Sequence, residues 1–136
     1  MKKIYKSKIS GLLLVLLILP ISITSYQAIV DKNWWAFLFL LITSLFILHL
    51  FLTTDYTLDQ NELYIRSGFI IHKRIAIKNI SKIKKTNSWL SSPALSLDRI
   101  EVFYNQYDST IISPKNKEDF ALEIKKLNPE AEINLK

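Results

Sequence analysis

The stretch ISGLLLVLLILPISITSYQAIVDKNWWAFLFLLITSLFILHLFLT, residues 9–53, decides the architecture of the chain. It contains two uncharged apolar runs, residues 9–30 and 34–53, separated by the tripeptide DKN. Each run has about the roughly 20 residues that a helix needs to cross the hydrocarbon layer of a membrane. Because so short a connection forces the two helices to run antiparallel, the sequence predicts a transmembrane helical hairpin over residues 1–54.

The charges on either side of this hairpin predict its orientation. Four lysines precede the first run and a segment rich in Lys and Arg follows the second run, whereas the connecting tripeptide has one lysine. Because Lys and Arg are enriched in the cytoplasmic segments of membrane proteins, we expect both termini in the cytoplasm. The chain would then be a multi-pass protein of the cell membrane with two spans. The four lysines are Lys2, Lys3, Lys6 and Lys8.

A cleaved signal peptide over residues 1–25 is the alternative interpretation of the first run. The basic start and the apolar run fit a signal peptide, but the best cleavage sequence, SIT at residues 22–24, lacks a clear small-x-small pattern. We therefore expect two uncleaved helices. His49 is expected to be a neutral side chain near the cytoplasmic interface, since no Asp, Glu, Lys or Arg accompanies it in either run.

The composition argues against several kinds of functional site. The chain has no cysteine, which excludes disulfides, thiolate catalysis and cysteine-ligated metals. Two histidines leave little for a metal site, and two glycines are too few for a phosphate-binding loop or a dinucleotide fingerprint. Ser91 or Ser92, His72 and Asp98 supply the residue types of a hydrolase triad, but no nucleophile elbow accompanies them. We expect no enzyme activity, no cofactor and no metal.

From residue 55 onward the pattern changes to short alternating segments followed by one amphipathic helix. Phe120, Ile124 and Leu127 recur at helical spacing after Asn116, a good N-cap residue, and Pro129 ends the pattern. The sequence predicts an α+β fold, in which antiparallel strands over residues 55–128 are covered by this helix, with a frayed tail over residues 129–136. The expected strands are residues 55–59, 62–68, 69–78, 80–87, 99–106 and 109–113.

The order of these elements resembles a pleckstrin-homology (PH) fold. Two motifs make the resemblance more specific: SSPALSLDRIEVFY at residues 91–104 and IISPKNKEDFALEI at residues 111–124. Together they are similar to the YyaB-like bacterial PH domain family, whose members pair an ALS-hydrophobic-DRI stretch with ISPK and a downstream Phe. The resemblance covers about residues 55–128. It implies the PH-like fold and transfers no catalytic residue to this chain.

A basic segment is the first candidate binding surface. Residues 73–85 contain six basic and no acidic residues, and strand alternation places Lys82 and Lys84 on one face. Lys82, Lys84 and Lys85 are therefore candidates for contact with an anionic membrane surface. The alternative is an ordinary solvated strand pair, whose lysines discourage edge-to-edge pairing with another sheet.

The two family motifs supply the other candidate residues. As corner pieces, their serines would bond neighbouring backbone groups in turns, Pro93 would fix the chain direction, and Arg99 would pair with Asp98 or another carboxylate. As a binding groove, Ser92, Ser96, Arg99 and Lys115 would suit an anionic or peptide ligand. Trp89 would either insert among lipid headgroups, hold a partner peptide, or pack under its own loop.

These patterns favour a membrane-anchored interaction module. We expect the PH-like domain to bind a protein, a peptide or lipid headgroups at the cytoplasmic face of the bilayer. Nucleic acid is disfavoured, because most of the net charge of +6 lies beside the apolar runs. The alternative is an immunity-type protein that protects the membrane from an antimicrobial peptide. An enzyme, or an accessory subunit of one, is the third hypothesis.

Overall fold

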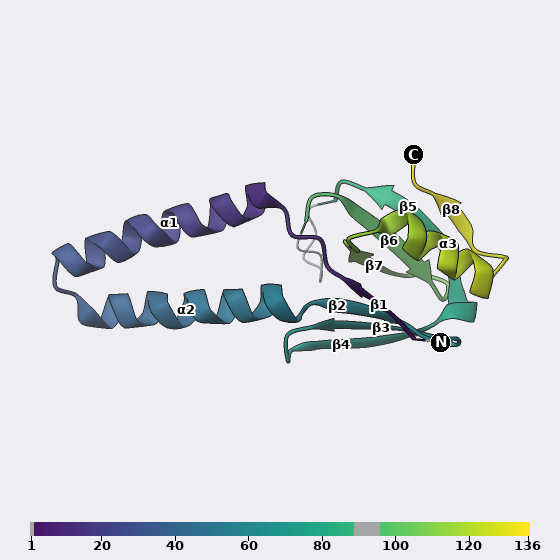
Figure 1. Ribbon diagram of the computed structural model, residues 1–136, viewed down its shortest axis with the longest axis horizontal. Helices are drawn as coiled ribbons and strands as arrows, with labels where there is room; N and C mark the ends of the chain where they lie inside the picture. Colours follow the sequence, from purple (N-terminus) through teal and green to yellow (C-terminus); the bar gives the residue numbers. More distant parts are fainter. Residues whose placement is uncertain (1, 89–95) are drawn as a thin grey trace.

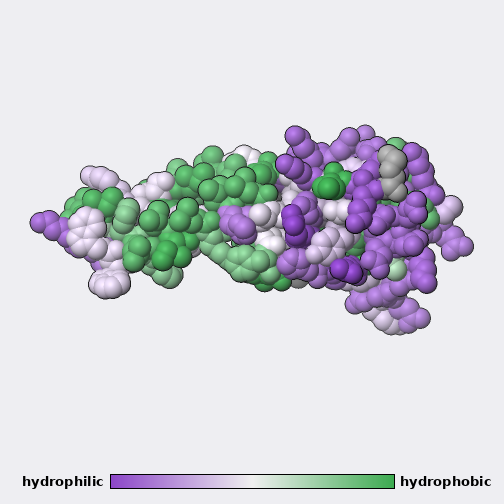
Figure 2. All heavy atoms as spheres, turned by 60° about the horizontal axis from the view of Figure 1, so that its bottom comes forward, coloured by the Kyte–Doolittle hydropathy of each residue, from purple (hydrophilic) through white to green (hydrophobic). Residues whose placement is uncertain are grey.

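The computed structural model describes residues 2–88 and 96–136, and in this part of the chain a long helical hairpin projects from one end of a β-domain (Figure 1). The hairpin consists of α1 (Gly11–Val30) and α2 (Trp34–Thr53), close to the two predicted runs. Both helices are long and apolar enough to cross a membrane, and almost none of their residues is buried. Figure 2 shows their apolar side chains as a band that adjoins the polar β-domain.

The β-domain contains two four-stranded sheets, as the expected α+β architecture requires. The first sheet has the spatial order β1 (Lys3–Lys6), β2 (Asp55–Leu58), β3 (Glu62–Ser67) and β4 (Ile71–Ala76). A 3-10 turn, η1 (Ile77–Asn79), leads to the second sheet. That sheet has the spatial order β7 (Asp108–Ile112), β6 (Arg99–Tyr104), β5 (Ile80–Thr86) and β8 (Glu132–Asn134).

The first strand is the main difference from the predicted fold. β1 precedes the helical hairpin and pairs antiparallel with β2, which follows it, so that Lys6 lies opposite Asp55 and Lys3 opposite Leu58. The hairpin is thus inserted between two neighbouring strands of one sheet. The N-terminal lysines were interpreted only as signals of membrane orientation. Tyr5, which is buried among them, completes an alternating strand pattern.

The pairing of the strands defines two ends of the β-domain. At the helix-proximal end, β1 leads toward α1 and β2 begins just after α2. At the distal end, the turn between β2 and β3 accepts a hydrogen bond from η1, with the Ile77 nitrogen 2.9 Å from the Asn61 oxygen. β5 therefore starts at the distal end and returns toward the helix-proximal end.

The segment between β1 and α1 joins the two sheets. Ser7 forms an antiparallel bridge with Pro114, and the Lys8 nitrogen lies 2.7 Å from the Ser113 oxygen. The Tyr56 hydroxyl, fully buried beneath this contact, donates to Ser7 Oγ at 3.1 Å and accepts from the Ser113 nitrogen at 3.2 Å. The ISPK motif is therefore a structural corner piece, as one of the two interpretations of the motifs predicted.

The C-terminal helix covers the open side of this sandwich. α3 (Lys117–Leu127) begins after Asn116, whose side chain caps it as predicted, and it buries Phe120, Ala121 and Ile124. The Phe120 ring meets the Tyr5 ring edge-to-face with centroids 5.3 Å apart, so β1 also supplies part of the surface on which the helix packs. Leu127 lies at the rim and is 38% exposed.

The last residues differ from the expected frayed tail. Residues 132–134 form β8, which pairs in parallel with β5, and Ala131 is fully buried. The buried Asn128 side chain donates to the carbonyls of Ile77 and Ile80 at 3.0 and 2.9 Å and so fixes the chain as it leaves α3. A three-residue strand carries too few alternating positions to be recognised in a sequence.

We predict that Tyr56→Phe destabilises the β-domain by about 1–3 kcal/mol, because it removes two buried hydrogen bonds while leaving the ring in place. The measured quantity is the urea concentration at which half of the β-domain is cleaved, determined by pulse proteolysis of the full chain in detergent micelles. Tyr107→Phe is the matched control, since Tyr107 is 96% exposed. Equal midpoints for both variants and the parent would contradict the structural role of the Tyr56 hydroxyl.

Candidate functional site: the helix-proximal end of the β-domain

Charged side chains gather where the β-domain meets the helical hairpin, and we call this group the helix-proximal ring. Each member is connected to residues 6–8 or to the first residue of β2 by a hydrogen bond, an ion pair or strand register, and Lys117 is connected through Asp98. With five basic and two acidic residues, the ring has a net charge of +3. The members are Lys6, Lys8, Asp55, Arg66, Asp98, Lys115 and Lys117.

Asp98 organises one half of the ring. Its carboxylate accepts from Lys117 Nζ and, at 2.9 Å, from Lys8 Nζ. These two ammonium groups, Lys117 first, hold the pKa of the Asp98 carboxyl below its ordinary value of 3.8. The carboxylate therefore fixes α3 and the chain before α1 in one arrangement while neutralising one of the two lysines.

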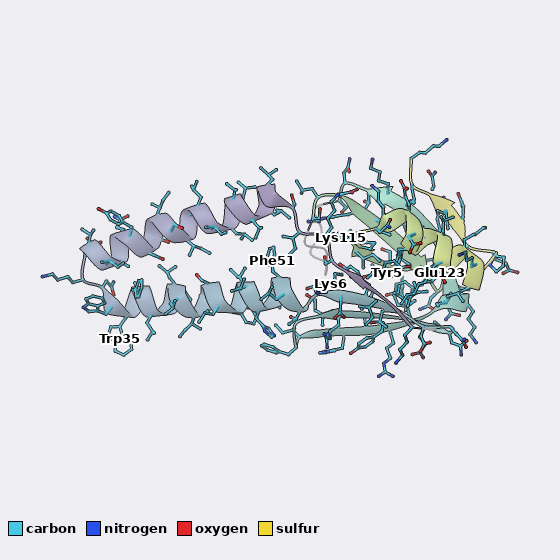
Figure 3. All side chains as sticks on the ribbon, in the orientation of Figure 1. Tyr5, Lys6, Trp35, Phe51, Lys115 and Glu123 are labelled. Atoms are coloured by element: carbon cyan, nitrogen blue, oxygen red, sulfur yellow. The ribbon has the colours of Figure 1, made fainter. Side chains whose placement is uncertain are left out.

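Lys6 and Lys115 are the open positions of the ring. Their backbones are bonded to each other, with the Lys115 nitrogen 2.9 Å from the Lys6 oxygen, and both residues are exposed. Neither forms an ion pair within residues 2–88 and 96–136. Figure 3 shows the two labelled lysines at the end of the domain nearest the helices. Their ammonium groups are thus free to bind an external anion.

The outer face of the first sheet completes the ring. Lys6, Asp55, Arg66 and His72 are successive partners across β1 to β4 and form one row at the helix-proximal end. Arg66 and Asp55 form an ion pair of 2.8 Å. A partly exposed pair of this kind contributes about 0–1 kcal/mol to stability. Breaking the pair so that Arg66 can turn toward an anionic ligand therefore costs little free energy.

The three lysines predicted as a binding surface lie on β5 of the second sheet and are not members of the helix-proximal ring. Lys82 pairs with Glu132 of β8 at 3.0 Å, and Lys84 pairs with Glu101 of β6 at 3.5 Å. Lys84 Nζ also lies 4.8 Å from the centre of the Phe103 ring. Lys85 is exposed, and among the described residues it forms no ion pair. Two of the three charges are therefore already compensated within the second sheet.

The residues predicted as a binding groove have mainly structural contacts where the structure describes them. Ser96 is buried and accepts a hydrogen bond from the Asp98 nitrogen at 3.2 Å. Arg99 donates to the carbonyls of Ser96 and Ser88, so its expected ion pair with Asp98 is replaced by backbone contacts. Lys115 belongs to the ring described above. Trp89 and Ser92 lie outside the described residues.

The groups considered for catalysis have other neighbours. The Asp98 carboxylate is bound by two lysines, and the His72 ring lies 6.2 Å from the Tyr64 ring on the outer face of the first sheet. Within the described part of the chain, no group of three or more His, Asp or Glu residues is arranged to hold a metal ion. No local pattern in the sequence indicates Lys6, Lys8 and Lys117 as site residues, because these three lysines come close to one another only through a contact between the two ends of the chain.

Two sheets of mainly antiparallel strands, closed by a helix near the C-terminus, define a PH-like domain, and comparison with known families agrees. The chain matches the family described as Bacterial PH domain over residues 54–128, which is more than half of its length, and it belongs to this family. The match confirms the resemblance found in the two sequence motifs. Strands β1 and β8 lie outside the matched range. Comparison with curated proteins and with solved structures gave no match.

Asp98→Asn is predicted to lower the stability of the β-domain at pH 7 by about 1 kcal/mol, since it removes two partly exposed ion pairs. Because the pKa of Asp98 is lowered in the folded state, its contribution is fully present above pH 3.8 and is lost as the pH falls through the lowered value. The stability of the parent and the variant should therefore converge below pH 3.8. Thermal unfolding of the full chain in detergent at pH 7 and pH 3 measures this, and an equal deficit at both values would exclude ionisation as the cause.

Proposed function

We propose that this chain is a membrane-anchored interaction module. In this proposal α1 and α2 span the cytoplasmic membrane, both termini lie in the cytoplasm, and the PH domain binds anionic lipid headgroups through the helix-proximal ring. The observation that carries the proposal is the insertion of the helical hairpin between β1 and β2. Because both ends of the hairpin continue into paired strands, the ring lies beside the helix ends and would lie at the surface of any bilayer that the helices cross.

The surfaces of the two helices support the membrane location. A helix that is apolar on all sides is either a membrane span or part of the core of a large protein. Residues such as Phe39 and Leu52 of α2 are 70% and 72% exposed, and the β-domain does not cover them. The helices therefore match a bilayer better than a protein core. Cleavage near residue 25 would remove β1 from its sheet, which argues against a signal peptide.

The charge of the ring supports anionic headgroups as the ligand. Each Lys or Arg near an anionic membrane surface contributes about 1 kcal/mol, and the effect fades within a Debye length of about 8–10 Å. Lys6 and Lys115 are both exposed beside the helix ends. If α1 and α2 cross a bilayer, these two ammonium groups face its headgroup phosphates. The compensated lysines of the second sheet, Lys82 and Lys84, would contribute less.

The orientation can be tested with single cysteines, because the natural chain has none. We expect Asp31→Cys, in the connection between the helices, to react with a membrane-impermeant maleimide added to intact cells. Tyr107→Cys, in the exposed turn between β6 and β7, should react only after the membrane is permeabilised. Labelling of Tyr107→Cys in intact cells would overturn the cytoplasmic location of the PH domain.

Headgroup binding is expected to depend on Lys6 and Lys115. Reversing both charges in Lys6→Glu/Lys115→Glu should lower the preference for phosphatidylglycerol over phosphatidylcholine by about tenfold or more, since two lysines contribute roughly 2 kcal/mol. The preference is measured by native mass spectrometry of the full chain, released from detergent micelles in the presence of both lipids.

Lys78→Glu/Lys126→Glu is the matched control for this measurement. It makes the same change in net charge at the distal end of the domain, on η1 and on the last turn of α3. The control should keep the lipid preference of the parent. Equal preference in all three proteins would refute headgroup binding by the ring and would favour a protein or peptide ligand.

A further inference from the structure

We propose that the turn between β3 and β4, residues 68–70, inserts into the lipid bilayer beside α2 and forms a third membrane contact of the chain. This inference rests on the proposed function, because it requires α2 to span the membrane. It assigns a membrane contact to the PH domain itself, separate from the two helices and from the charged ring. In Figure 1 this turn reaches back alongside the end of α2.

The position of the turn along α2 carries the argument. The Cβ that an alanine would place at Gly68 would be 2.6 Å from Leu50 Cδ2, so the backbone of the turn is in direct contact with this helix. The Phe69 ring is centred 5.6 Å from the His49 ring and 5.9 Å from the Phe46 ring. Since a helix rises about 1.5 Å per residue, Leu50 and Phe46 lie roughly 5 and 10 Å before the end of α2 at Thr53. The tip of the turn is therefore level with the apolar part of the helix.

A buried polar contact fixes this position. Thr54, directly after α2, shares a hydrogen bond of 2.8 Å with Ser67 at the end of β3, and Thr54 Oγ1 also donates to the Leu50 oxygen at 2.7 Å. Both hydroxyl-bearing residues are buried. Gly68 then adopts a φ of 60°, which a residue without Cβ does at no steric cost, and turns the chain along the helix. The turn is thus held against α2 at its base.

The side chains of the turn match a lipid environment. Phe69 is 66% exposed and Ile70 is 61% exposed, although both are large apolar residues at the end of a soluble-type sheet. Ile71, the first residue of β4, is also 37% exposed. These apolar side chains continue the lipid-exposed surface of α2 onto the PH domain.

The charges next to the turn also fit this depth. Arg66 and His72, register partners on β3 and β4, are the first polar side chains on the outer face beyond the turn. They would lie at headgroup level when Phe69 and Ile70 lie in the upper acyl region. An apolar tip followed by polar side chains, one of them the Arg66 cation, is the arrangement of a segment anchored at a membrane interface. A protein partner would need no such agreement between the tip and the level of α2.

The test measures the depth of Ile70 in the full chain, using single cysteines with nitroxide labels in phosphatidylglycerol–phosphatidylcholine vesicles. Collision with oxygen, which concentrates in lipid, is compared with collision with a water-soluble nickel chelate. Ile70→Cys should show a high oxygen-to-nickel ratio, close to that of Leu45→Cys on the exposed surface of α2. Leu122→Cys, at an apolar position of α3 with the same 61% exposure as Ile70, should show a low ratio.

Each outcome has a separate meaning. A low ratio at Ile70 with a high ratio at Leu45 would overturn the insertion of the turn and leave the membrane anchor intact. Low ratios at both positions would overturn the membrane anchor and the inserted turn together. Protection of Ile70 from both reagents would show that a protein, or a second copy of this chain, covers the turn, and this too would overturn the proposal.

Discussion

The backbone pairing of β1 with β2 is the interaction on which the rest of the structure depends. Residues 3–6 and 55–58 are far apart in the chain, yet they are adjacent in one sheet because an antiparallel hairpin brings its own two ends together. Closing a long loop costs conformational entropy, and the preformed helical pair removes most of that cost. In return, the strands fix both ends of the hairpin to the domain. Tyr5 and Tyr56, buried on these two strands, then connect the segments that flank the helical hairpin to the core and to α3.

This constraint also determines where charge can act. The lysines that precede α1 are brought beside Asp98, Lys115 and Lys117, which come from the other end of the chain. Ion pairs within the domain, those of Asp98 and the Arg66–Asp55 pair, neutralise some of this charge. The remainder is presented by Lys6 and Lys115 on the side from which the helices leave. The basic strand β5 shows the opposite case, because Lys82 and Lys84 are matched by acidic residues on the two neighbouring strands.

Much of this fold is visible in the sequence, because its longer elements follow strong periodicities. The two apolar runs, the six strands of the central segment and the capped helix after Asn116 are all found close to their predicted positions. The missing elements, β1 and β8, have only four and three residues, and both are strands only because a distant partner is present. The site was harder to predict for the same reason. Nothing local in the sequence indicates that Lys6 lies beside Lys115, or that Phe69 packs on α2. Lys82 and Lys84, in contrast, belong to a basic run that is obvious in the sequence, but ion pairs with residues distant in the chain neutralise them.

The nested position of the helices has a consequence for biogenesis. Because the strand made first must wait for a partner that follows both helices, the first sheet cannot be completed until the whole apolar segment has been synthesised. Until that partner arrives, each of the two strands has an unpaired edge, and such edges promote aggregation. Completion of the sheet therefore depends on the two helices folding back on each other and bringing β1 to β2.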